Sequence, residues 1–464
     1  MPTDIAADDP TVVPPAAPAD GKGLETAPFS PAYTRYALWL LLGIYTINFL
    51  DRQVINILAE PIKKDLGLAD WQLGLMSGLA FALFYTFLGL PIARLAEKRN
   101  RALIIGTSVA VWSGFTALCG SAQTFSQLLL YRIGVGVGEA GCTPPAHSLI
   151  SDMVPREKRS SALAFYHMGT PIGSLLGLVF GGLVADAYGW RMAFLVAGVP
   201  GLIFAALAVF TLREPRKLIA AQAARAQALS ATFGETLKHL MKTPTFGLVA
   251  AAAAVQAFVG YGHSPFTVSF FLRVHSAEVA DLAKVVGGWF GWDLGPIGFM
   301  GLSLGIFSGV AGAGGAFFGG WLADRAARRD IGSIMTGPAI ASLVSVPVYI
   351  AAVSLPSALG ALIMLAISVF LGTIWYGPIY ASAQSVAPAH MRATASAILV
   401  FIINLIGLGL GPLGVGILSD ALNHAGLGSA EGVRWALILS TLIGVATFFC
   451  LWRVRKTLAR DSIS

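Results

Sequence analysis

Long apolar runs separated by short polar segments make up most of this chain. Each run is about 20 residues or longer, enough helix to cross the hydrocarbon core of a bilayer. Backbone in lipid must be hydrogen-bonded within its own segment, and the short alternating segments of a β-barrel do not dominate here. The pattern therefore predicts an all-α membrane protein with about twelve transmembrane helices. The runs lie at residues 36–58, 72–95, 102–122, 125–150, 162–185, 192–212, 245–273, 299–323, 333–355, 358–386, 393–420 and 433–453.

The first six runs resemble the last six, so the chain contains an internal repeat. The segment that starts at Pro155 resembles the one 233 positions later, and Pro145 aligns with Pro378 at the same spacing. Asp186 ends the fifth run as Asp420 ends the eleventh. Two related halves of this kind place a binding site between them, near the midplane of the membrane. The predicted segments are a disordered tail at 1–35, a six-helix half at 36–212, a cytoplasmic linker at 213–244, a second six-helix half at 245–454 and a tail at 455–464.

Basic residues gather in alternate loops. The formal net charge is +7, and an excess of Lys and Arg marks the cytoplasmic loops of a membrane protein. We therefore expect both termini in the cytoplasm, a position in the cell membrane, and no nucleic-acid partner. The long connection at 274–298 carries Trp289 and Trp292, which suit the outer membrane interface. The basic loop residues are Arg94, Lys98, Arg99, Arg101, Arg156, Lys158, Arg159, Arg325, Arg328 and Arg329.

Several function classes lack their sequence features. Cys119, Cys142 and Cys450 lie inside apolar runs without paired spacing, which predicts neither a disulfide framework nor a metal site. The chain has no zinc-protease, nucleophile-elbow or P-loop motif, so we expect no enzyme, no cofactor and no ATP-driven pump. A channel would need a filter loop or a ring of charges, which the two pseudo-repeats do not supply.

A doubled loop links the chain to a known family. The stretch Gly320-Trp-Leu-Ala-Asp324-Arg-Ala-Ala-Arg-Arg329 resembles the signature of the major facilitator superfamily, and a degenerate copy with Glu97 lies in the first half. The resemblance implies two pseudo-symmetric six-helix halves, alternating access, and a single chain as the working unit. It also implies that the loop charges form a cytoplasmic latch, although such charges can equally be solvated topology signals. The latch residues are Glu97, Asp324, Arg325 and Arg328.

A second set of residues in the first half narrows the resemblance. Asn48-Phe-Leu-Asp51-Arg52, the run from Arg132 to Glu139, and Ser151-Asp152 are similar to the Spinster branch of that superfamily. This similarity implies secondary active export of a lysophospholipid or a sphingosine 1-phosphate-like lipid, coupled to protons. The alternative is a proton-coupled symporter of a small organic anion. A cavity that opens sideways between helices would favour the lipid, and a sealed central cavity the small anion.

Three ionisable residues of the first half are candidates for proton coupling. Asp51 follows an uncharged stretch, and a charge at mid-bilayer costs about 2.5–3.5 kcal/mol unless it is paired, wetted or functional. Asp51 could instead lie solvated near the outer mouth. Arg132 and Glu139 are seven residues apart, so they share a helix face about 10 Å apart along the axis. Glu139 could carry a proton during transport, with its proton affinity switched as Arg132 moves toward it or away, or the two could form a static ion pair.

The second half lacks this acidic set, because Gly372 stands where the repeat would place a counterpart of Glu139. We therefore expect proton coupling in the first half and a substrate cavity shaped by the second. Arg52 or Arg132 could meet a phosphate, and aromatic rings could line a cavity for an acyl chain, although each candidate could be plain packing. Gly377-Pro378 is expected to bend its span. The substrate-binding candidates are Asn48, Arg52, Trp375, Tyr376 and Asn404.

Overall fold

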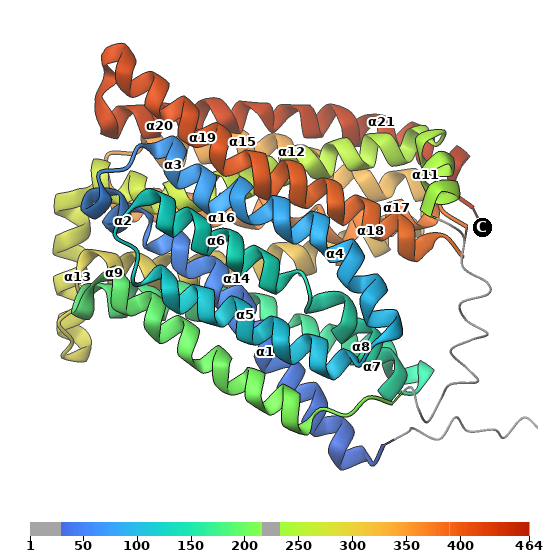
Figure 1. The fold of residues 1–464 in the computed structure, drawn as a ribbon. Helices are drawn as coiled ribbons and strands as arrows, with labels where there is room; N and C mark the ends of the chain where they lie inside the picture. Colours follow the sequence, from blue (N-terminus) through green and yellow to red (C-terminus); the bar gives the residue numbers. More distant parts are fainter. Residues whose placement is uncertain (1–28, 216–232, 389, 464) are drawn as a thin grey trace, which may run out of the picture.

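The computed structural model describes residues 29–215, 233–388 and 390–463. Within these residues every regular element is a helix, and the long helices run side by side along one axis (Figure 1). Most of the predicted N-terminal tail and of the predicted linker lies outside the described residues. The all-helical prediction is confirmed.

The helices of the first half, called the N-half, extend to residue 211. They are α1 (Pro31–Ile57), α2 (Ala59–Leu66), α3 (Asp70–Gly74), η1 (Leu75–Leu79), α4 (Ala80–Lys98), α5 (Arg101–Cys119), α6 (Phe125–Glu139), α7 (Thr143–Met153), α8 (Arg156–His167) and α9 (Gly169–Thr211).

The helices of the second half, called the C-half, begin at residue 233. They are α11 (Phe233–Met241), α12 (Pro244–Val274), α13 (Ser276–Phe290), α14 (Pro296–Ala327), η2 (Ile331–Met335), α15 (Thr336–Ser354), α16 (Ala358–Thr373), α17 (Tyr376–Ser385), α18 (Arg392–Ile402), η3 (Ile403–Leu410), α19 (Gly411–Leu422), η4 (Asn423–Leu427), α20 (Gly428–Ile443) and α21 (Val445–Asp461).

Twelve membrane spans fit these elements. Eight helical stretches of the described chain are long and apolar enough to cross a membrane, and two of them, of 51 and 68 residues, are long enough for two spans each. The first reverses direction at Gly189, where φ is 82°, and the second at Gly426, where φ is 98°. Glycine adopts this left-handed backbone without a Cβ penalty. Adding α1 and the pair α6–α7 completes the predicted set.

Proline breaks one span in each half at equivalent positions. A proline ring clashes with the carbonyl four residues earlier and removes a helix hydrogen bond. Pro145 lies four residues after Gly141, in the gap between α6 and α7, and Pro378 lies four residues after Ile374, in the gap between α16 and α17. The bend predicted near Gly377-Pro378 is therefore present, and its repeat mate in the N-half is a second break.

The two ends of the bundle differ. The C-terminus and α11 lie at one end, here called the terminal end, whereas α2, α3 and α13 lie at the other, here called the gate end (Figure 1). Helix α13 contacts the bundle through Val279, Ala283 and Gly287, while the side chains of Val285 and Trp289 are 52% and 73% exposed. This helix lies across the gate end as an amphipathic segment.

One carboxylate fixes α13 to a neighbouring span. Glu278 accepts hydrogen bonds from the Ala358 backbone N–H at 2.6 Å and from the Ser357 hydroxyl at 3.0 Å. These groups form the N-terminus of α16, where a negative charge is favoured. The backbone hydrogen bond from Ala358 is the main cause that holds the pKa of Glu278 below its ordinary value.

Candidate transport site

Glu139 forms an ion pair with Arg52, at the centre of the N-half. Glu139 is the last residue of α6, with a side chain that is 0% exposed, and its Oε2 accepts a hydrogen bond from Arg52 Nε at 2.7 Å. The alternative of a static Arg132–Glu139 pair is wrong. Two helical turns put those side chains on one face but too far apart along the axis, and α1 supplies the nearer guanidinium.

Aromatic rings surround the Arg52 guanidinium. Its central carbon lies 5.1, 4.9 and 4.6 Å from the ring centroids of Phe49, Phe81 and Tyr85. A cation over ring faces is attracted by their quadrupoles, more strongly where water is excluded. The Arg52 side chain is only 14% exposed, so in this conformation it is committed to Glu139 and the rings.

Asp51 lies beside this pair and is fully buried. Its Oδ2 accepts a hydrogen bond from Thr116 at 3.1 Å, and its Oδ1 has no hydrogen-bond partner among the described residues. A solvated position near the outer mouth is therefore excluded. Arg132 is also buried; its Nε lies 3.5 Å from the Met76 carbonyl oxygen, and it contacts no carboxylate in the described part of the chain. Each of these two ionisable side chains is thus buried without a salt-bridge partner among the described residues.

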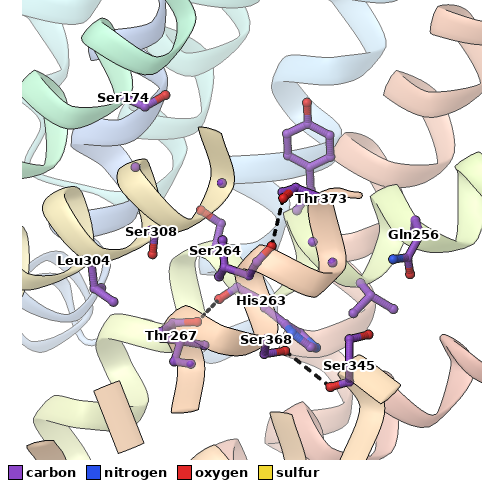
Figure 2. A pocket seen from close by; sticks show the side chains of 18 of the residues that line it. Ser174, Gln256, His263, Ser264, Thr267, Leu304, Ser308, Ser345, Ser368 and Thr373 are labelled. Carbon is purple, nitrogen blue, oxygen red and sulfur yellow. Dashed lines mark hydrogen bonds between the residues drawn. The ribbon is translucent and has the colours of Figure 1, made fainter. Parts of the chain in front are cut away.

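A cavity of about 600 Å³ lies between the halves, mostly against the C-half. Its N-half wall comes from Gln53 of α1 and from α9, and its C-half wall from α12, α14, α15 and α16. Polar side chains from several of these helices gather around it (Figure 2). Its lining residues, all within the described chain, include His263 but no Asp, Glu, Lys or Arg.

The predicted substrate residues fall into two groups. Trp375 and Tyr376 line the cavity, whereas Asn48, Arg52 and Asn404 are not among its lining residues. The sequence interpretation missed the polar face of α12. Its members follow Gln256 by seven, eight and eleven residues, the spacing of one helix face, and that periodicity within an apolar run was the available signal. They are Gln256, His263, Ser264 and Thr267.

The predicted latch residues lie at the terminal end. Asp324, Arg325 and Arg328 are exposed and form no ion pair within the described residues, while Glu97 lies in the last turn of α4. Arg101, the last residue of the degenerate loop copy, is instead fully buried. It donates to Asp152 at 2.6 Å and also pairs with Glu214. The role of the exposed charges stays a prediction.

At the gate end, ionic contacts join the two halves. Arg273, near the end of α12, contacts Glu60 at 2.7 Å and Asp70 at 2.8 Å in the N-half. Asp70 also pairs with Lys63 at 2.5 Å and accepts a hydrogen bond from the Ser419 hydroxyl at 2.6 Å. The network is almost fully buried, so this end is closed.

The repeat-related aspartates complete this closure. Asp420 accepts hydrogen bonds from the backbone N–H groups of Asp70 and Trp71, at 3.1 and 2.7 Å. Asp186 accepts from those of Ile297 and Gly298, at 3.2 and 2.6 Å. Each carboxylate therefore caps a helix N-terminus of the opposite half, where unpaired N–H groups and the helix dipole favour an anion. The two caps are reciprocal across the pseudo-symmetry.

Two six-span halves around a central cavity define a transporter fold. The family model of the Major Facilitator Superfamily matches residues 41–412, and the chain belongs to this superfamily. A bacterial homologue of the human lysosomal transporter Spinster, crystallised in an inward-facing and unoccupied conformation, is similar in structure. It is 30% identical, with a TM-score of 0.81 over 94% of this chain and 100% of that one.

Two curated relatives match along most of their length. An MFS-type efflux pump of Mycolicibacterium smegmatis is 31% identical over 429 residues, 92% of this chain and 94% of that protein. The hexuronate transporter of Bacillus subtilis is 25% identical over 386 residues, 81% of this chain and 85% of that protein. The predicted superfamily and the Spinster resemblance are confirmed, and of these relatives only the hexuronate transporter has a name that states a substrate.

Proposed function

We propose that this protein is a proton-coupled secondary transporter that exports an amphipathic lipid of the lysophospholipid or sphingosine 1-phosphate class by alternating access. The observation that carries the proposal is the way α9 and α14 line the cavity. The basic loops would place the terminal end, with both termini, in the cytoplasm of a cell whose plasma membrane holds the protein. The closed gate end would then face outward, so the described conformation would be inward-facing.

Helices α9 and α14 contact each other near the gate end and diverge beyond it. A Cβ at Gly182 would lie 2.7 Å from the Ile297 carbonyl oxygen, and one at Gly305 would lie 3.1 Å from the Leu175 side chain. One turn farther from the gate end, both helices line the cavity with small side chains, including Ser308 and Gly309. The lining includes no residue of α4 or α18. We infer that an acyl chain would leave the cavity sideways, between α9 and α14.

The buried charges of the N-half support proton coupling. Protonation of Glu139 would remove the negative charge that holds Arg52, leaving the guanidinium held by ring faces alone. Gln53, the next residue along α1, lines the cavity, so a shift of Arg52 would reach its wall. Asp51 and Arg132 are a second carboxylate and guanidinium that a rearrangement could bring together. Buried charges without partners are costly, so a rearrangement that pairs Asp51 with Arg132 would recover part of that cost.

A small organic anion is the second candidate substrate. The relative named a hexuronate transporter and the nearby Arg52 favour it. The described cavity lining holds no basic side chain other than His263, so a carboxylate and a lipid phosphate alike would need a counter-cation from outside the lining. The apolar part of the lining, which suits an acyl chain, is what favours the lipid.

Flux in proteoliposomes tests both candidates. A labelled lysophospholipid and a labelled hexuronate are compared with and without an imposed pH gradient, for wild type, Glu139→Gln and the control Asp281→Asn, an aspartate whose side chain is 77% exposed. We expect the gradient to accelerate lipid flux in wild type and the control but not in Glu139→Gln. Gradient-driven hexuronate flux without lipid flux would establish the second candidate, and a response kept by Glu139→Gln would refute the assigned proton site.

A further inference from the structure

One corner of the cavity, here called the His263 corner, consists of His263, Thr267, Ser345, Tyr349 and Ser368, from α12, α15 and α16. Its polar atoms are unevenly divided between donors and acceptors. A hydroxyl has one proton and two lone pairs, so a hydroxyl that donates to its own bundle can offer a ligand only an acceptor.

Three hydroxyls of the corner have already donated their protons. Thr267 donates to the His263 carbonyl at 2.9 Å, and Ser368 donates to the Ser345 carbonyl at 3.3 Å (Figure 2). Ser345 donates to the carbonyl of Ser342 at 2.8 Å. These side chains satisfy helix carbonyls, and their remaining lone pairs are what the cavity can use.

The hydrogen bonds of Ser440 determine which nitrogen of the His263 ring carries the proton. Its Nε2 lies 3.0 Å from the Ser440 hydroxyl oxygen, and Ser440 donates its single proton to the Ala436 carbonyl at 2.7 Å. The Nε2 atom must therefore donate, which leaves Nδ1 of the neutral ring as an acceptor. Stacking on Tyr349, with ring centroids 4.4 Å apart and planes at 28°, fixes the ring orientation.

The Tyr349 hydroxyl is the one polar group of the corner that calls for a partner. It is buried and forms no hydrogen bond of normal geometry among the described residues, although the Thr267 hydroxyl, which already donates to the His263 carbonyl, lies near it. A buried hydroxyl without a partner costs about 1–3 kcal/mol, so a ligand that supplies one would bind with that gain. A ligand hydroxyl can accept from Tyr349 and donate to a lone pair of the corner, whereas a phosphate or carboxylate oxygen cannot donate.

We propose that the His263 corner binds a hydroxyl-bearing, uncharged part of the substrate, of the glycerol type, and excludes an anionic group. This inference rests on the proposed amphipathic substrate and specifies which part of it the C-half recognises. An anionic group, where the substrate has one, would be held outside this corner. The small side chains of α14 leave the neighbouring space to the alkyl chain.

Binding of two probes with the same alkyl chain tests the inference. The probes are 1-O-dodecylglycerol and dodecyl phosphate, added to the full-length protein in lipid nanodiscs. The signal is the change in tryptophan fluorescence when a probe is added. Only the part of this change that is absent in Trp375→Phe is counted, because Trp375 is buried and lines the cavity. We expect dodecylglycerol to bind more tightly than dodecyl phosphate.

The variants separate the corner from the rest of the cavity. His263→Phe keeps the stacked ring but removes the acceptor, and should weaken dodecylglycerol binding roughly five- to tenfold, the effect of one lost hydrogen bond. His263→Gln, which can donate to Ser440 and still offer an oxygen, should restore most of it. Thr107→Val removes a hydroxyl of α5 that donates only to carbonyls of its own helix and does not line the cavity, so it serves as the control, with binding unchanged.

Each outcome decides between the claims. Dodecyl phosphate binding as tightly as dodecylglycerol, or binding that His263→Phe leaves unchanged while the protein stays folded, would overturn the His263 corner but not the proposed lipid substrate. If neither probe gives a Trp375-dependent signal, the amphipathic substrate itself is refuted. If both histidine variants fail to fold, Ser368→Ala takes their place with the same expected direction.

Discussion

The reciprocal aspartate caps should set how firmly the gate end is closed. The perturbation is Asp420→Asn or Asp186→Asn, which keeps the shape of each side chain and removes its charge. Each carboxylate accepts two backbone N–H groups of the opposite half, at 2.7 and 3.1 Å for Asp420 and at 2.6 and 3.2 Å for Asp186. The closed state should therefore lose part of two charge-assisted hydrogen bonds and of the helix-dipole attraction.

The magnitude follows from those contacts. Hydrogen bonds to charged groups contribute about 1.5–3 kcal/mol, and an anion at a helix N-terminus about 0.3–1 kcal/mol or more where it is buried. An asparagine still accepts one of the two bonds, so we expect a loss of about 1–2 kcal/mol. That loss multiplies the ratio of gate-open to gate-closed molecules by roughly 5 to 30.

Distances between spin labels at Lys64 and Ala425 measure this ratio. Both residues are exposed at the gate end, Lys64 on α2 of the N-half and Ala425 in η4 of the C-half. Either variant should enrich a longer-distance population, and by a similar factor, because the two caps are equivalent; Asp281→Asn should leave the distribution as in wild type. Unchanged distributions in both variants would refute the gating role, and a change in one alone would refute the equivalence.

Three further predictions follow from other parts of the molecule. Gly309→Phe should fold normally but slow transport at least tenfold in the flux assay, because a Cβ at Gly309 meets nothing within 4 Å and the ring would fill the cavity; wild-type flux would refute the cavity as the route. A nitroxide spin label at Val285 should be relaxed more by membrane-dissolved oxygen than by a water-soluble nickel complex, because Val285 and Trp289 share the apolar exposed face of α13. A label at Lys284 should be relaxed more by the nickel complex. Equal relaxation of the two labels would contradict an interfacial helix. The contact between Glu278 and the start of α16 should be fully present above the ordinary glutamate pKa and be lost as pH falls through the lowered pKa of the folded state. The Lys284 label should therefore become mobile only at acid pH. Glu278→Gln should remove this pH dependence.

The fold was largely predictable because its two main signals are local. Apolar run length determines where a helix can cross a membrane, and a proline determines where that helix must break. The bend near Pro378 could be predicted for this reason. The equivalent break before Pro145 could have been predicted in the same way, because Pro145 aligns with Pro378 in the repeat. The gate-end helices α2 and α3 lie in short polar stretches, where run length carries no information.

The site was predictable only where a charge contrasts with its surroundings. Asp51 and Glu139 were found because ionisable residues are rare inside apolar runs. The partner of Glu139 could not be found in the same way, because Arg52 lies on another helix and only packing brings the two together. His263 was missed because hydroxyls and a single histidine are common in spans and usually bond to their own helix. Their importance depends on which hydroxyl protons already donate to helix carbonyls, and only the three-dimensional structure shows this.

Asn56 connects the two halves of the site in a way that affects how the transporter can evolve. Its single amide nitrogen lies 3.2 Å from the Arg52 carbonyl oxygen, 3.0 Å from Gln53 Oε1 and 2.9 Å from the Ser264 hydroxyl. Two N–H protons reach three acceptors only if one proton is shared, so the three contacts compete with one another. Under the proposed function, Asn56 would join the substrate-binding wall of the C-half to the proton-coupling residues of the N-half. Substitutions in the C-half wall would then change the substrate of a descendant protein while the N-half residues stay the same.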